Sequence, residues 1–125
     1  ALAHPDIGVL ATDASAAAVA SARATAAANA VEDRVVVRQA DGLEDVPDAS
    51  VALILLNPPF HIGAAVHTGI AERLIADAGR ALAHGGELWC VWNGHLGYRP
   101  LLDRIGETRQ VSRNAKFVVT ATRRR

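Results

Sequence analysis

The sequence predicts an α/β fold, in which a mostly parallel sheet ends in a terminal antiparallel pair of strands. Three observations predict it: short apolar or β-branched runs alternate with helical segments, capping and glycine residues bound the helices, and Asp or Asn follows several strands. Strands that alternate with helices imply parallel pairing through right-handed crossovers. The 125 residues are enough for one domain and too few for two.

The first third of the chain contains two predicted strands with a helix between them. Ile7–Thr12 is an apolar run that predicts a strand. Ser15 has the side chain of a helix N-cap, and the alanine-rich segment after it predicts a helix to about Asn29. Val35–Gln39 is a β-branched run and predicts the second strand.

A third strand and a long helix follow. Val51–Leu56 is apolar throughout, as in a strand that is buried on both faces. A helix over Ala64–Ala83 is predicted by apolar residues at every fourth position, namely Val66, Ile70, Leu74, Ala78 and Leu82. We expect Gly85–Gly86 to end this helix.

The last third of the chain predicts shorter elements. Glu87–Asn93 is the fourth predicted strand, and Arg99–Ile105 predicts a short helix. Arg109–Val111 and Phe117–Thr122 are expected to form the antiparallel pair.

The composition bounds the class of protein. Half of the residues are hydrophobic and 21% are charged, which is typical of a soluble globular domain. No apolar run approaches the roughly 20 residues of a membrane span, and no signal peptide is evident. The single cysteine, Cys90, excludes an internal disulfide and is expected in the core of a cytoplasmic protein.

The charge is unevenly distributed along a chain whose formal net charge is zero. Residues 1–93 contain five arginines and eleven acidic residues, whereas residues 94–125 contain eight basic and two acidic residues. This asymmetry indicates either an anionic partner near the C-terminal part or a solvated basic tail. If RNA lies there, Arg113 and Lys116 are expected to contribute to its binding.

Polar residues occur where the predicted parallel strands end. Asp13 follows the first strand, Asp41 lies just beyond the second, Asn57 follows the third, and Asn93 closes the fourth. Ligands of open parallel sheets bind beyond the carboxyl ends of the strands. The sequence therefore predicts a site at this edge.

The tetrapeptide Asn57-Pro58-Pro59-Phe60 is the most informative motif. Two prolines after a strand form a rigid turn, since each fixes φ and removes a backbone donor. The Asn57 side chain and the Pro58 carbonyl could accept both N–H bonds of a planar amine and align its lone pair toward an electrophile. Phe60 could then stack on the target base, although an ordinary proline-rich turn with a core phenylalanine is the alternative.

The two acids have structural alternatives as well. Asp13 at a strand end could accept ribose hydroxyls, or it could share helix capping with Ser15. Asp41 before Gly42 could accept from an adenine amino group, or it could be a turn residue.

The tetrapeptide at Asn57–Phe60 resembles motif IV of class I S-adenosylmethionine-dependent methyltransferases that act on amino groups. Three further features, His61 with Gly63, the stretch Trp92–Tyr98, and Asn114–Phe117, resemble the C-terminal catalytic domain of bacterial ribosomal RNA guanine-N2 methyltransferases, particularly the small-subunit enzyme. The resemblance covers nearly the whole chain and implies a Rossmann-like sheet. It also implies S-adenosylmethionine as cofactor and ribosomal RNA or a ribosomal subunit as partner, with neither a metal nor a membrane.

The resemblance also implies roles for individual residues. Those expected at the cofactor are Asp13 and Ala14 at the ribose and Asp41 with Gly42 at the adenine. Those expected at the target base are Asn57, Pro58, Pro59 and Phe60 as the catalytic turn, with His61, Asn93, His95 and Lys116 as further substrate-binding positions.

The family's first strand and glycine-rich cofactor loop have no counterpart in these residues. The missing strand would lie centrally, between the strands at Ile7–Thr12 and Val51–Leu56, so we expect residues 1–125 to be a partial methyltransferase domain of a larger protein. The segment by itself is then expected to bind S-adenosylmethionine poorly.

Other functions remain open from the sequence. The acceptor could be adenine N6 or a protein glutamine, because the proline motif is common to those enzymes. A non-catalytic RNA-binding or structural domain of the same fold is a second class, and a dinucleotide-dependent oxidoreductase would also use an acid such as Asp13.

Overall fold

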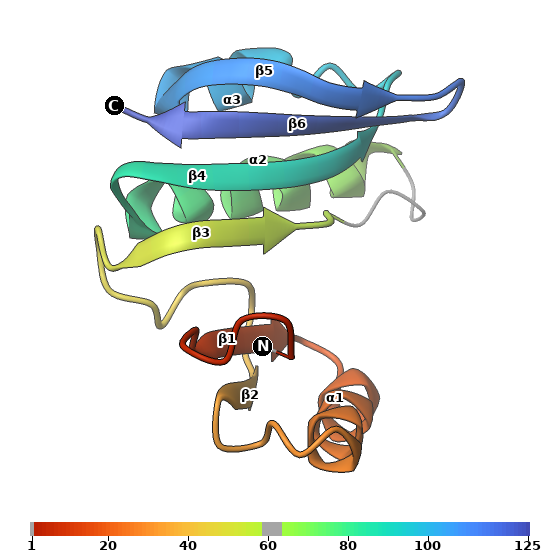
Figure 1. Ribbon diagram of the computed structural model, residues 1–125. Coiled ribbons are helices and arrows are strands. Elements are labelled where there is room, and N and C mark those ends of the chain that lie inside the picture. Colours follow the sequence, from red (N-terminus) through yellow and green to blue (C-terminus); the bar gives the residue numbers. More distant parts are fainter. Residues whose placement is uncertain (1, 59–63) are drawn as a thin grey trace. The chain divides into compact units, whose positions relative to one another are not determined.

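Two compact units, Ala1–Asp45 and Val46–Arg125, make up the chain in a computed structural model that describes residues 2–58 and 64–125 (Figure 1). Both units combine strands with helices, and in each unit a helix connects the two parallel strands. The predicted α/β class is therefore confirmed.

The first unit is a strand–helix–strand motif. Strand β1 (Val9–Asp13) pairs in parallel with β2 (Val35–Gln39), and helix α1 (Ala16–Ala28) connects them. Ser15 is the N-cap of α1, as predicted, because its hydroxyl oxygen accepts a hydrogen bond from the Ala18 amide at 3.2 Å.

The second unit contains a four-stranded sheet with two helices. Its elements in chain order are β3 (Val51–Leu56), α2 (Ala64–Ala81), β4 (Leu82–Asn93), α3 (Arg99–Ile105), β5 (Gly106–Arg113) and β6 (Phe117–Arg124). The strand order is β3-β4-β6-β5, with β3 and β4 parallel and β6 antiparallel to both of its neighbours. The predicted antiparallel pair is confirmed, and it is longer than the sequence indicated.

The core of the second unit lies on one face of this sheet. Leu88, Cys90 and Trp92 of β4 alternate toward that face and are buried, and α2 and α3 pack against β4, β5 and β6. The expectation that β3 is buried on both faces is wrong. Leu53 and Leu55 point to the opposite face with 53% and 76% of their surface exposed, since the two helices of this unit cover only one face.

The buried stripe of α2 also differs from the predicted one. Ala71, Ile75 and Ala78 are almost completely buried, whereas Ile70 and Leu74 are only half-buried. A helix has 3.6 residues per turn, so a strict spacing of four drifts around the helix and does not follow one face. The side chain of Val66 lies outside the described residues.

Helix α2 ends before the glycines that were expected to end it. Its last carbonyl groups, of Arg80 and Ala81, accept hydrogen bonds from the backbone amides of Ala49 (2.9 Å) and Ser50 (2.8 Å). Because the segment before β3 satisfies these carbonyls, no glycine C-cap is needed, and Gly85–Gly86 lie within an irregular start of β4.

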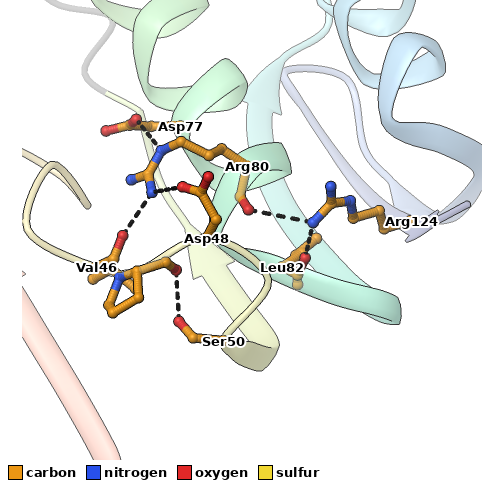
Figure 2. A network of polar contacts seen from close by, with 8 residues as sticks. Val46, Asp48, Ser50, Asp77, Arg80, Leu82 and Arg124 are labelled. Atoms are coloured by element: carbon orange, nitrogen blue, oxygen red, sulfur yellow. Dashed lines mark hydrogen bonds and ion pairs between the residues drawn. The ribbon is translucent and has the colours of Figure 1, made fainter.

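Arg80 connects the same segment to α2 through its side chain (Figure 2). Its guanidinium donates to the carbonyl of Val46 at 2.6 Å and to the carboxylates of Asp48 (2.7 Å) and Asp77 (3.1 Å). These two carboxylates raise the pKa of Arg80 above its ordinary value. Arg124 of β6 donates to the Arg80 carbonyl, so the end of α2 is held from both sides.

Candidate functional site

The first unit brings the four predicted cofactor residues to one edge. They are Asp13, Ala14, Asp41 and Gly42. The Ala40 amide donates to the carbonyl of Asp13 at 3.1 Å, and the Thr12 hydroxyl donates to the carbonyl of Gly42 at 2.8 Å. The carboxyl ends of β1 and β2 therefore lie side by side, as the parallel register predicted.

The Asp13 carboxylate is exposed and is only partly engaged by the protein. Its Oδ1 accepts the Ser15 amide at 2.8 Å, which is the helix-capping role considered from the sequence. Among the described residues, Oδ2 has no hydrogen-bond donor. The capping role and a ligand-binding role are therefore compatible, because each uses a different oxygen.

Asp41 and Gly42 form an exposed turn after β2. The Asp41 amide donates to the Glu44 carboxylate at 3.3 Å, and its carbonyl accepts from the Glu44 amide. Gly42 has a φ of 63°, a left-handed conformation that favours glycine. The turn role of Asp41 is thus present, and the side chain lies at the surface beside the strand ends.

The second unit places Asn57 at the carboxyl edge of its parallel strands. β3 ends beside β4, with Leu56 paired to Cys90, and Asn57 follows it with an exposed side chain. The ring of Pro58 is fully buried. The buried proline anchors the backbone while the amide beside it faces solvent. Pro59, Phe60 and His61 lie outside the described residues, so their expected roles remain predictions.

Asn93, His95 and Lys116 come together where β4 ends. Asn93 pairs with Phe117 of β6, its Oδ1 accepts the His95 amide at 3.0 Å, and the Gly94 amide donates to the Lys116 carbonyl at 3.1 Å. His95 and Lys116 are exposed. The Asn93 side chain therefore builds the turn, which is a role that the sequence did not assign.

Asn114 is a further residue whose role the sequence analysis missed. Its Oδ1 accepts the backbone amides of Lys116 (2.9 Å) and Phe117 (2.7 Å), and it closes the turn between β5 and β6. An asparagine between two predicted strands is the signal that could have indicated this turn, because an Asn side chain can accept from the backbone two residues further on. The Lys116 ammonium lies over the Phe117 ring, 5.3 Å from its centroid.

The interior below this edge is aromatic and apolar. The centroid of the buried Tyr98 ring lies 5.8 Å from the centroid of the Trp92 ring, and the Trp92 indole N–H donates to the Thr120 hydroxyl at 3.2 Å. Burial raises the pKa of the Cys90 thiol to about 12 and also raises the pKa of Tyr98. Cys90 is therefore a core residue, as expected, and not a thiolate nucleophile.

The part of the chain that the structure describes does not meet the requirements of a metal site or of a membrane-spanning helix. Within it, no three His, Cys, Asp or Glu side chains are grouped as metal ligands would be. None of its helices is both long and apolar enough to cross a bilayer.

The chain is similar to known methyltransferases in sequence. The family model of the methyltransferase small domain matches residues 1–121. A "Ribosomal RNA large subunit methyltransferase G" of Streptomyces coelicolor is 50% identical over 119 residues, and one of Ectopseudomonas mendocina is 43% identical over 120 residues. These alignments cover 94% and 95% of this chain, yet the chain spans only 32% of the length of each relative.

The fold has solved counterparts. A T. thermophilus 16S rRNA N2 G1207 methyltransferase, solved in complex with AdoMet and guanosine, superposes with a TM-score of 0.82 at 27% identity, over 94% of this chain and 32% of that chain. A geranyl diphosphate methyltransferase solved with SAM superposes with a TM-score of 0.72 at 15% identity, which shows the fold alone. The Rossmann-like methyltransferase architecture expected from the resemblance is therefore confirmed.

Proposed function

Because the chain belongs to the methyltransferase small domain family, we propose that it forms part of an enzyme that methylates an exocyclic amine of a nucleic-acid base. The methyl donor is S-adenosylmethionine, and the proposed acceptor is guanine N2 in ribosomal RNA. The proposed activity is that of the whole protein, of which residues 1–125 form one part.

The exposed Asn57 amide next to the buried Pro58 ring carries this proposal. An acceptor oxygen on an anchored backbone at the carboxyl edge of a parallel sheet lies where ligands of such sheets bind. Anchoring limits the motion of the amide, so that little reorganisation is needed when it binds an amine.

Asp13 and Gly42 suit the cofactor that we propose. The Oδ2 atom of Asp13 can accept a ribose hydroxyl while Oδ1 still caps α1. Gly42 adds no side chain to the turn beyond β2, so that a planar base can approach the backbone there. Bound S-adenosylmethionine would supply an electrophilic methyl group.

The proposed contribution of Asn57 is alignment of the acceptor. Its Oδ1 accepts an N–H bond of the target amine, and the Pro58 carbonyl accepts the second one. Two such bonds orient the nitrogen lone pair away from both acceptors and toward the methyl group. No strongly basic side chain is needed, since the proton can leave after the new C–N bond has formed.

The relatives favour RNA of the large ribosomal subunit as the substrate. The relatives that are 43% and 50% identical are named for the large subunit, whereas the small-subunit enzyme is 27% identical. We therefore propose a large-subunit guanine in place of the small-subunit type expected from the sequence motifs. Adenine N6 and a protein glutamine remain outcomes of the experiment.

The proposal includes a further parallel strand and a cofactor loop supplied from outside residues 1–125. Among the described strands, β1 pairs only with β2, and β3 pairs only with β4.

The experiment is a methyl-transfer assay with labelled S-adenosylmethionine and the intact protein. Deproteinised ribosomal RNA from the two separated subunits serves as the substrate, and a glutamine peptide serves as the alternative acceptor. We expect label in large-subunit guanine and none with Asn57→Ala. The control Gln110→Ala removes an exposed amide from β5, away from the strand ends, and should retain activity.

Label in adenine or in the peptide would replace the proposed acceptor and retain the enzyme class. A protein that binds RNA but transfers no methyl group to any acceptor would be a non-catalytic binding domain, and the proposal would be wrong.

A further inference from the structure

Four of the eight basic residues of the C-terminal part form two groups on the hairpin of β5 and β6. At one end of the sheet, Arg109 and Arg123 both contact the Glu87 carboxylate, at 3.1 and 3.5 Å. Arg109 is the main cause that lowers the pKa of Glu87, so this carboxylate is held in its charged form. These arginines are therefore partly neutralised by the protein itself.

Arg113 and Lys116 form the second group, on either side of the turn between β5 and β6. Both are exposed. Neither makes an ion pair with any acidic residue within 2–58 and 64–125. Cations without a counter-ion of their own can bind an anionic partner without first breaking an internal ion pair.

These two cations flank the end of β4. The Arg113 guanidinium lies against Gly94, where a Cβ atom would come within 3.0 Å of its Nη2. Arg113 is in register with Val118, and the Lys116 ammonium lies over the ring of Phe117. Neighbouring residues of a strand point to opposite faces of the sheet, so the two cations lie on opposite sides of this edge.

The same edge holds the candidate substrate residues of the second unit. The Gly94 amide donates to the Lys116 carbonyl, and Asn93 is paired with Phe117. β3, which leads to Asn57, is the parallel neighbour of β4. An anionic polymer that contacts Arg113 and Lys116 would thus pass beside the strand end that carries the proposed catalytic amide.

The turn that presents these cations is already ordered. Asn114 accepts the amides of Lys116 and Phe117, and its own amide donates to the Phe117 carbonyl at 3.0 Å. A preformed turn loses less conformational entropy when a ligand binds to it.

We propose that Arg113 and Lys116 bind backbone phosphates of the RNA strand next to the target base. The inference rests on the proposed function and adds to it the surface that holds the nucleic acid. Phosphate contacts orient a nucleic acid and supply affinity without reading its sequence.

The test measures RNA binding by the intact protein over a series of salt concentrations. The probe is a short RNA hairpin with unpaired guanines in its loop, followed by fluorescence anisotropy. Each lost contact with a single strand should reduce the slope of log affinity against log salt by roughly 0.7. We therefore expect a decrease of about 0.7 for Arg113→Gln or Lys116→Gln and about 1.4 for the double variant.

Two variants serve as matched controls. Arg123→Gln removes a charge from the other end of the same hairpin, where Glu87 partly neutralises it, and should leave the slope unchanged. Arg113→Lys keeps the charge and should retain the slope. An unchanged slope in the double variant, or an equal decrease in Arg123→Gln, would overturn the inference.

The methyl-transfer assay separates this inference from the proposed function. If the protein methylates guanine, but replacing Arg113 and Lys116 does not change the slope of log affinity against log salt, the proposed function stands and the proposed phosphate-binding surface is wrong. If these variants decrease the slope, but the protein methylates no acceptor, the phosphate-binding surface stands and the proposed function is wrong.

Discussion

The guanidinium of Arg113 lies directly against the backbone of Gly94, two β-strands away in the sheet. A Cβ atom at residue 94 would approach Nη2 to 3.0 Å and the Val118 side chain to 3.5 Å. The absence of a side chain at Gly94 thus determines where the cation of Arg113 is held.

We expect Gly94→Ala to displace Arg113 and to weaken RNA binding. The contacting atom is the end of a flexible side chain, so it can move, and the free energy of unfolding should change by only about 0.5 kcal/mol. Anisotropy titrations and urea unfolding measure the two effects. Gly8→Ala is the control, because a Cβ there meets nothing within 4 Å. Unchanged affinity in Gly94→Ala would show that Arg113 is not held in place by this contact.

Substitutions at Asp13 should separate helix capping from cofactor binding. Asp13→Asn keeps an Oδ1 acceptor for the Ser15 amide but removes the negative charge, so the fold should persist. Hydrogen bonds to charged groups contribute about 1.5–3 kcal/mol, and the affinity for S-adenosylmethionine should therefore fall roughly tenfold or more in calorimetry of the intact protein.

The matching control for Asp13 is Ser15→Ala. It removes the hydroxyl that accepts the Ala18 amide and should cost about 1 kcal/mol of stability without reducing the affinity for the cofactor. Equal cofactor binding by the wild type and Asp13→Asn would leave Asp13 with the capping role alone.

Cys90 should make the folded state less stable at alkaline pH. Burial raises its pKa to about 12, so above the ordinary thiol pKa the unfolded chain loses a proton that the folded chain retains. Stability should therefore fall as pH rises above about 9, by up to about 1.4 kcal/mol for each pH unit. Urea unfolding at several alkaline pH values measures this slope.

Cys90→Ala should unfold more easily at neutral pH, because it leaves a cavity, but its alkaline slope should be shallower. Rapid modification of the folded wild type by a thiol reagent at neutral pH would contradict the buried position of Cys90.

Two glycine substitutions should have opposite effects on stability. A Cβ at Gly106 would overlap the carbonyl oxygen of Arg123, a backbone atom of the paired strand that cannot move away freely. Gly106→Ala should therefore destabilise the protein by about 3 kcal/mol or more.

Gly69 lies within α2, and a Cβ there meets nothing within 4 Å. Gly69→Ala should therefore stabilise the protein by about 0.5–1 kcal/mol, as alanine does in a helix interior. Urea unfolding compares both variants with the wild type. A Gly106→Ala variant as stable as the wild type would contradict the strand register at Gly106, and a destabilised Gly69→Ala variant would contradict the open position of Gly69.

Local signals in the sequence predicted most elements correctly. The β-branched run Val35–Gln39 and the capped segment after Ser15 lie where they were predicted, because β-branched side chains and N-cap hydroxyls act within a few residues. The short helix Arg99–Ile105 also agrees with the prediction.

The incorrect predictions were those that depended on distant segments. The end of α2 depends on the amides of Ala49 and Ser50, which are more than thirty positions earlier in the chain. The exposure of Leu55 depends on which face the helices cover, and an apolar run contains no information on that.

The sequence by itself determined the family, the α/β class and the residues at the strand ends, because these follow from local pattern and from motifs such as Asn57–Phe60. Only the tertiary structure decided that Glu87 partly neutralises Arg109 and Arg123, while Arg113 and Lys116 lie without an acidic partner among the described residues. The physical reason is that the effect of a charge depends on what lies within a few ångströms of it. Strand register, which pairs residues far apart in the chain, sets those neighbours.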